Sequence, residues 1–94
     1  MRLPKKIEIS GYTLTIIYKD KIVEGEECFG YYDSNKKQIA LVKGMSPARK
    51  REIFIHEFMH FLEDIYRISI THEGITSIAL GMIQLLNNKK IKWE

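Results

Sequence analysis

Residues 46–66 read SPARKREIFIHEFMHFLEDIY, and this stretch decides the fold. Ser46 can cap a helix by accepting hydrogen bonds from backbone amides, and Pro47 suits the first helical position because its nitrogen carries no proton. Apolar residues follow at helical spacing, so we predict a helix from Pro47 to about Tyr66. Its buried stripe is expected to comprise Ile55, Phe58, Leu62 and Ile65, with Met59 beside them.

The middle of this helix carries the motif His56-Glu57-Phe58-Met59-His60. Two histidines at i and i+4 project from one helical face, which lets their nitrogens reach one zinc ion at about 2.0–2.1 Å. Glu57 is rotated by a fraction of a turn, so it can reach a water on the metal without becoming a ligand. The motif predicts zinc ligands at His56 and His60 and a general base at Glu57.

A catalytic zinc site needs a third protein ligand and one open position. The metzincin extension would place Gly at position 63 and His at position 66, but this chain has Glu63 and Tyr66, which excludes that class. The third ligand must come from another element. The candidates are His72, the only other histidine, and Glu73.

A second helix is expected to start near Ser69 to Thr71 and to end near Leu86. Periodicity places His72 on the stripe that must pack inward, whereas Glu73 lies on another face and suits a helix N-terminus in any case. We therefore predict His72 as the third ligand, with Glu73 as the alternative. The inward stripe is expected to comprise His72, Ile75, Ala79, Met82, Ile83 and Leu86.

The first half of the chain is rich in strand-forming residues. We predict strands at Lys6–Ser10 and Tyr12–Lys19 around a Ser10-Gly11 turn, then a hairpin of Cys28–Asp33 and Gln38–Val42. The resulting fold is α+β, with a small three- or four-stranded sheet packed on the motif helix and the second helix. Residues 1–94 are expected to form one domain, because a chain of 94 residues has no room for a second core.

Composition narrows the classes of protein. The 15 basic and 12 acidic residues are dispersed, which argues against a nucleic-acid partner. Apolar stretches stop well short of the roughly 18 residues that a membrane span needs, and no apolar leader follows the N-terminus, so a cytoplasmic protein is expected. Cys28 is the only cysteine and cannot form an internal disulfide, which leaves packing, a metal or a partner chain to stabilise the fold.

The chain resembles the minigluzincins, single-domain zinc metallopeptidases of about this length from thermophilic prokaryotes. More distantly it is similar to the catalytic cores of membrane metallopeptidases of the CAAX-protease and antibiotic-sensor types. The likeness is carried by Cys28–Asp33, Ile39–Val42, Ile55–His60, and His72 opening a helix through Ile78–Gly81. It implies hydrolysis of a peptide or protein substrate and a His as third ligand. It also implies an edge strand that binds substrate along the cleft rim, comprising Cys28, Phe29, Gly30, Tyr31 and Tyr32.

The family likeness further implies a latent zymogen blocked by its C-terminal segment, here residues 87–94. Trp93, the only tryptophan, and Glu94 lie in that segment, and a terminal Trp suggests docking. The tail would cross the cleft within its own chain or between two chains, which would make a homodimer. The mechanism also needs an oxyanion donor, for which Tyr31, Tyr32, Tyr66 and Arg67 are candidates.

A protein-binding or regulatory module is the competing interpretation. In such a module the zinc would hold the two helices together and would take no part in catalysis. A closed site with four protein ligands would favour that module, and an open position on the metal would favour the enzyme.

Overall fold

A computed structural model describes residues 3–21 and 29–91 of the chain. Four strands precede two helices, in the order expected from the sequence, and the fold is α+β. The strands are β1 (Lys6–Ile9), β2 (Tyr12–Lys19), β3 (Gly30–Asp33) and β4 (Gln38–Val42); the helices are α1 (Pro47–Tyr66) and α2 (His72–Leu86).

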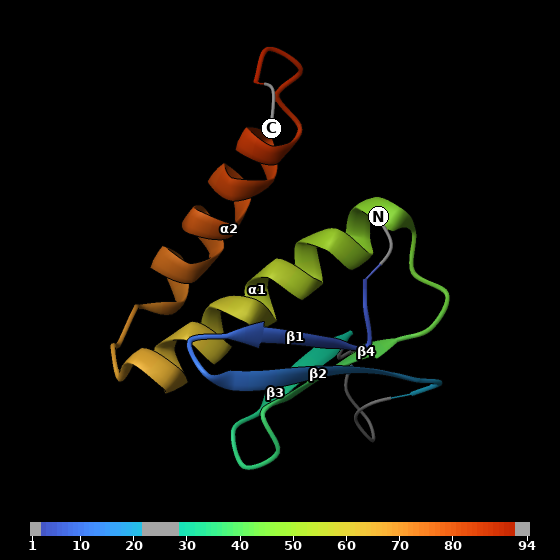
Figure 1. Cartoon of the computed structure of the whole chain (residues 1–94). Coiled ribbons are helices and arrows are strands. Elements are labelled where there is room, and N and C mark those ends of the chain that lie inside the picture. Colours follow the sequence, from blue (N-terminus) through green and yellow to red (C-terminus); the bar gives the residue numbers. More distant parts are fainter. Residues whose placement is uncertain (1–2, 22–28, 92–94) are drawn as a thin grey trace.

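The four strands form one mixed sheet in the order β1-β2-β4-β3 (Figure 1). β1 and β2 pair antiparallel through a turn in which both Ser10 and Gly11 have positive φ, as tight hairpins with right-handed twist require. β3 and β4 form the second antiparallel hairpin. The two hairpins join through a parallel pairing of β2 with β4, which leaves β3 at one edge of the sheet.

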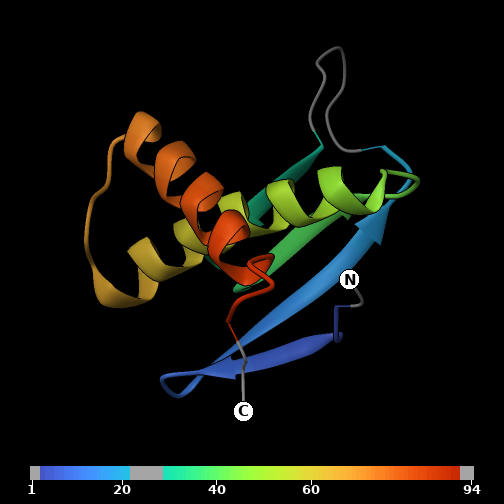
Figure 2. The same ribbon diagram turned by 90° about the horizontal axis from the view of Figure 1, so that it is seen from above.

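α1 is the middle layer of the molecule. It packs on β3 and β4, and α2 packs on α1 (Figures 1 and 2). The core forms where α1 covers the sheet, because β2 and β4 turn branched apolar side chains towards one aromatic ring of α1. The fully enclosed cluster comprises Leu14, Ile16, Ile39, Leu41 and Phe61.

The buried stripe of α1 differs from the one predicted. Phe61, which was not assigned to the stripe, is fully buried, whereas Phe58 is only partly buried and Ile55 lines an apolar groove facing α2. The physical reason is that α1 has two apolar partners. Phe61 and Ile65 pack on the sheet side, and Ile55 and Met59 line the groove that faces α2. Three residues, Phe54, Phe58 and Leu62, contribute to both sides, so one stripe at helical spacing cannot describe both faces.

Both ends of α1 are fixed. Ser46 accepts a hydrogen bond from the Arg49 amide at 3.2 Å and Pro47 occupies the first turn, as predicted. At the other end, Arg67 adopts a left-handed conformation and its amide returns to the Glu63 carbonyl. The Tyr66 hydroxyl contacts the Ser10 hydroxyl in the β1–β2 turn, which ties this end of α1 to the sheet.

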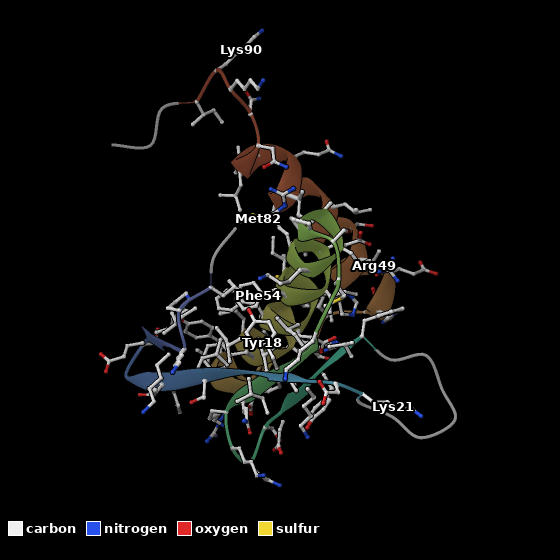
Figure 3. All side chains as sticks on the ribbon, turned by 90° about the vertical axis from the view of Figure 1, so that its right-hand side faces the viewer. Tyr18, Lys21, Arg49, Phe54, Met82 and Lys90 are labelled. Carbon is white, nitrogen blue, oxygen red and sulfur yellow. The ribbon has the colours of Figure 1, made fainter. Side chains whose placement is uncertain are left out.

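α2 is buried along only the first part of its length, and its C-cap Asn87 accepts a hydrogen bond from Arg51 of α1. Thr71 caps it by accepting from the Gly74 amide at 3.0 Å, and Ile75 and Ala79 are buried against α1. The predicted inward stripe fails beyond that point, because Met82 is 41% and Leu86 49% exposed. Met82 and Leu86 line an apolar groove that remains between the second half of α2 and α1, and Figure 3 shows Met82 on the far side of Phe54 from Tyr18 of the sheet.

Within the described residues, neither helix has the length and apolar character required to cross a bilayer. Residues 87–91 follow α2 at the end opposite His72. Three residues to which the sequence assigned roles, Cys28, Trp93 and Glu94, lie outside the described residues.

Candidate metal centre

The three histidines of the chain gather at one place between the two helices. The ring centres of His56 and His60, one turn apart on α1, are 5.2 Å from each other. The ring centre of His72, in the first turn of α2, is 5.3 Å from that of His56. His72 thus faces α1, as its periodicity predicted, and residues distant in sequence meet because α2 folds back along α1.

These separations can be compared with those around a metal. A zinc–nitrogen bond of about 2.0–2.1 Å puts each imidazole centre about 3.2 Å from the ion, so two rings at a tetrahedral angle have centres about 5 Å apart. The observed separations of 5.2 and 5.3 Å fit that value. Three imidazoles are also the donor set of known catalytic zinc sites, so the residues present fit a zinc ion.

The ring nitrogens themselves are not arranged as a finished site. The imidazoles pack edge to face, at 69° and 65°, and within residues 3–21 and 29–91 no three His, Cys, Asp or Glu side chains form a ready-made metal-binding group. Rotation about χ2 of histidine swings the nitrogens while the ring centre hardly moves. The backbone therefore sets the ring spacing. Both angles involve His56, so rotation of His56 about χ2 changes them while the contact of His60 with Glu63 is kept.

His56 occupies the centre of the cluster. Its pKa is lowered from the ordinary histidine value, first because burial disfavours the imidazolium and then because His60 and His72 lie close by. A lowered pKa keeps His56 neutral, which is the form that ligates metals.

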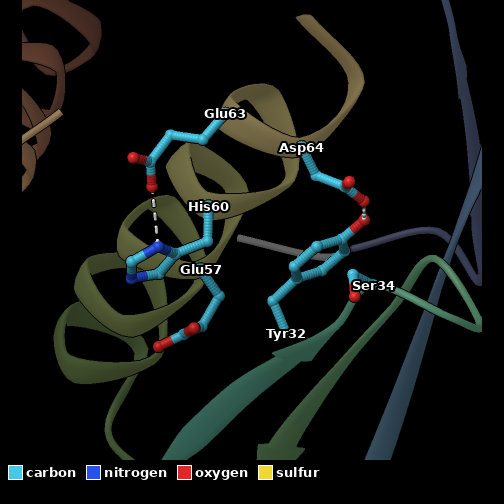
Figure 4. Close-up of a pocket in the computed structure, with 6 residues that line it drawn as sticks. All are labelled: Tyr32, Ser34, Glu57, His60, Glu63 and Asp64. Atoms are coloured by element: carbon cyan, nitrogen blue, oxygen red, sulfur yellow. Dashed lines mark hydrogen bonds and ion pairs between the residues drawn. The ribbon is translucent and has the colours of Figure 1, made fainter. Parts of the chain in front are cut away.

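His60 has a specific partner on its own helix. Its Nδ1 atom lies 2.8 Å from Oε1 of Glu63, one turn along α1 (Figure 4). The other carboxylate oxygen of Glu63 accepts from the Ile70 backbone amide at 2.8 Å. These interactions hold the pKa of Glu63 below its usual range, with the Ile70 hydrogen bond as the first cause.

Glu57 stands between two pockets that share it. One pocket of about 520 Å³ is lined by Tyr32, Ser34, Glu57, His60, Glu63 and Asp64 (Figure 4). The second, of about 260 Å³, is lined by Phe29, Glu52, Ile53, His56, Glu57, Thr76, Ala79 and Leu80. Burial raises the pKa of Glu57 to about 7 in the metal-free protein. Glu57, which the motif predicts as the general base, thus lies at the junction of both pockets.

The strand beside these pockets is β3. It lies at the sheet edge, and Phe29 before it, Tyr32 within it and Ser34 after it each line one of the two pockets. The strand predicted to begin at Cys28 begins instead at Gly30 within the described residues. Gly30 is required where β3 passes α1, because a Cβ there would lie 2.7 Å from Cγ2 of Ile53.

The four candidate oxyanion donors differ in their positions relative to the pocket that contains Glu57 and His60. Tyr66 contacts Ser10, Arg67 forms the C-cap of α1, and the Tyr31 hydroxyl accepts from Nζ of Lys19 at 2.9 Å. Tyr32 alone lines the pocket with Glu57 and His60, but its hydroxyl donates to Asp64 at 2.6 Å. Burial and that hydrogen bond raise the pKa of Tyr32. The hydroxyl therefore stays protonated, and its proton is engaged in the hydrogen bond to Asp64.

Sequence reasoning missed Glu63, Asp64 and Ser34 as residues of the site. Glu63 was detectable in principle, since a carboxylate three residues after a helical histidine lies on the same side of the helix. Asp64 and Ser34 were not, because they meet only through the packing of α1 on β3. Glu73 is exposed in the first turn of α2, where an acidic side chain suits the N-terminus of a helix.

Comparison with known proteins gave no match to a family model, to a curated protein or to a solved structure. The functional argument therefore depends on the residues of this chain and their geometry.

Proposed function

We propose that this chain is a zinc-dependent metallopeptidase, with His56, His60 and His72 as the metal ligands and Glu57 as the general base. The observation that carries the proposal is the meeting of three imidazoles from two helices at ring separations of 5.2 and 5.3 Å, with Glu57 beside them at the junction of two pockets. The resemblance to minigluzincins supports the same assignment.

Zinc in such a site supplies a Lewis acid that activates water and polarises a carbonyl group. The chain supplies the remaining parts. Glu57 accepts a proton from the attacking water and returns it to the leaving amine, which requires a carboxylate that faces the cleft and is not itself a ligand. The substrate would lie against the residues of α1 and β3 that line the first pocket.

The substrate class follows from the position of β3. An extended peptide can add to a sheet edge through backbone hydrogen bonds, while pockets beside the strand receive alternate side chains. β3 is such an edge, and a pocket lies on either side of Glu57. We therefore assign an unfolded peptide or protein segment as substrate, and the cytoplasm expected from the sequence remains part of this proposal.

Stoichiometric metal analysis tests the ligand set. Wild-type protein should bind one zinc, and His56→Ala, His60→Ala and His72→Ala should lose it, whereas Glu73→Ala should retain it. Glu57→Gln should keep the metal and abolish cleavage of a quenched fluorescent peptide library. Loss of zinc from the Glu73 variant with retention in the His72 variant would exchange their roles. Zinc-loaded protein that cleaves no peptide even after residues 89–94 have been removed would contradict the enzyme.

Latency is a further part of the proposal, in which the C-terminal segment occupies the cleft within its own chain or in a second chain. A truncation must spare Asn87, because its side chain accepts from Nη1 of Arg51 at 2.9 Å and its amide closes α2. A chain ending at Asn88 should therefore keep α2 and cleave peptides faster than the full chain. Equal rates at equal zinc content would rule out inhibition by residues 89–94.

A protein-binding module is the second candidate function, and the exposed surface of α2 favours it. Five large apolar side chains on this helix are at least 41% exposed, namely Ile78, Leu80, Met82, Leu85 and Leu86. Residues 74–88 contain no charged side chain, so two copies could pair through this helix without burying a charge. Sedimentation of the wild type beside Leu80→Lys measures that pairing, and cobalt absorption distinguishes an open site from a closed one.

A further inference from the structure

Glu63 contacts one histidine of the cluster, His60, and the backbone just before α2. Its side chain joins α1, which carries His56 and His60, to the connection that leads into α2 and His72. Oε1 lies 2.8 Å from Nδ1 of His60, and Oε2 accepts from the Ile70 amide at 2.8 Å. The carboxylate of Glu63 therefore contacts the candidate ligand His60 on α1. It also contacts the backbone two residues before the candidate ligand His72 on α2.

The contact with His60 determines which ring nitrogen carries the proton. A carboxylate is acceptor-only, so the short contact to Nδ1 requires that this nitrogen be the donor. A neutral imidazole protonated at Nδ1 presents an unprotonated Nε2, which is the atom available to a metal. Glu63 thus selects the tautomer in which His60 can ligate through Nε2.

The contact with Ile70 lies directly before the start of α2. Ile70 precedes the N-cap Thr71, and His72 follows directly. The backbone of Glu63 acts a few residues earlier, at the C-terminal end of α1, where its carbonyl accepts from the amides of Arg67 and of Ile68, the latter at 3.1 Å. The connection from α1 to α2 is therefore tied to residue 63 at its beginning by the main chain and near its end by the side chain.

We propose that Glu63 is a positioning residue that sets the tautomer of His60 and the approach of His72 at the same time. This inference rests on the proposed zinc site and adds a residue outside the ligand set and the general base. Carboxylates that orient a ligating histidine typically change metal affinity by 10–100-fold when removed.

Only glutamate meets both demands at this position. Glutamine has the same shape but one acceptor and one donor group, so it can accept from His60 or from Ile70 but not from both. Aspartate keeps two acceptors and is shorter by one methylene. Asp64 provides a matched control because it is the next carboxylate on α1 and bonds to Lys37 and Tyr32 rather than to a histidine.

The experiment compares wild type, Glu63→Gln, Glu63→Asp and Asp64→Asn in two measurements. ¹⁵N imidazole spectra of the metal-free proteins report the His60 tautomer, and competition with a chelator reports zinc affinity. Wild type and Asp64→Asn should show Nδ1–H at His60 and affinities within about threefold. Both Glu63 variants should lose the pure Nδ1–H tautomer and bind zinc about 10–100-fold more weakly.

The outcomes separate this inference from the proposed function. Wild type that binds no zinc would overturn the proposed function together with this inference. Wild type that binds zinc while Glu63→Gln binds it equally well would overturn the positioning role alone. An Nε2–H tautomer of His60 in metal-free wild type would also overturn it, and that measurement requires no variant to fold.

Discussion

α1 and α2 both contribute histidines to the candidate metal centre, but the fold holds them very differently. α1 is packed on the sheet, capped at both ends, and buries Phe61 completely. α2 packs mainly on α1 and leaves Leu80 46% exposed. Two of the candidate ligands therefore stand on a firmly supported helix, and the third stands on a weakly supported one. Metal binding should matter most for the second helix.

The largest expected effect on the free energy of unfolding tests how firmly α1 is packed on the sheet. Phe61→Ala removes a fully buried ring from the core and should lower the free energy of unfolding by about 3–5 kcal/mol, the usual cost of such a cavity. Leu80→Ala on α2 should change it by less than about 0.5 kcal/mol. Urea denaturation of both variants provides the measurement, and similar losses would show that α2 is as firmly held as α1.

The second effect depends on the metal. Zinc at 100 times its dissociation constant should stabilise the folded chain by about 2.7 kcal/mol. Hydrogen exchange should show the gain in protection mainly in α2, because α1 is already fastened to the sheet. In His72→Ala the gain in α2 should disappear. Equal gains in both helices would mean that α2 needs no metal to hold it.

The caps of the two helices allow a finer comparison. Ser46→Ala and Thr71→Ala each remove a side-chain acceptor at an N-cap and should each cost about 1 kcal/mol. Only Thr71→Ala should also weaken zinc binding, because His72 lies in the turn that Thr71 caps. Chelator competition on both variants tests this, and an equal effect on affinity would remove the distinction between the helices.

The smallest expected effect concerns pH. Hydrogen bonds from Lys37 and Tyr32 hold the pKa of Asp64 below its usual range, so the folded state binds this proton less readily than the unfolded state. The stabilisation is present above the ordinary aspartate pKa and is lost as pH falls through the folded value. The urea midpoint should therefore fall less steeply with acid in Asp64→Asn than in wild type.

Local signals predicted most of the secondary structure. The cap at Ser46, proline at position 47 and the Ser10-Gly11 turn each act within a few residues, and β2, β4 and α1 have the bounds expected from the sequence. The buried faces were predicted less well. Phe61 and Met82 depend on where neighbouring elements pass, and helical periodicity alone contains no such information.

The sequence by itself determined the α+β class and the motif face of α1, because i,i+4 spacing fixes that His56 and His60 lie side by side on any helix. The position of His72 beside His56, the parallel joining of the two hairpins, and the pairing of Glu63 with Ile70 were decided only by the tertiary structure. The reason is that each requires two segments with separate local preferences to meet. Their meeting is set by burial of apolar surface between layers, which no single stretch of the chain specifies.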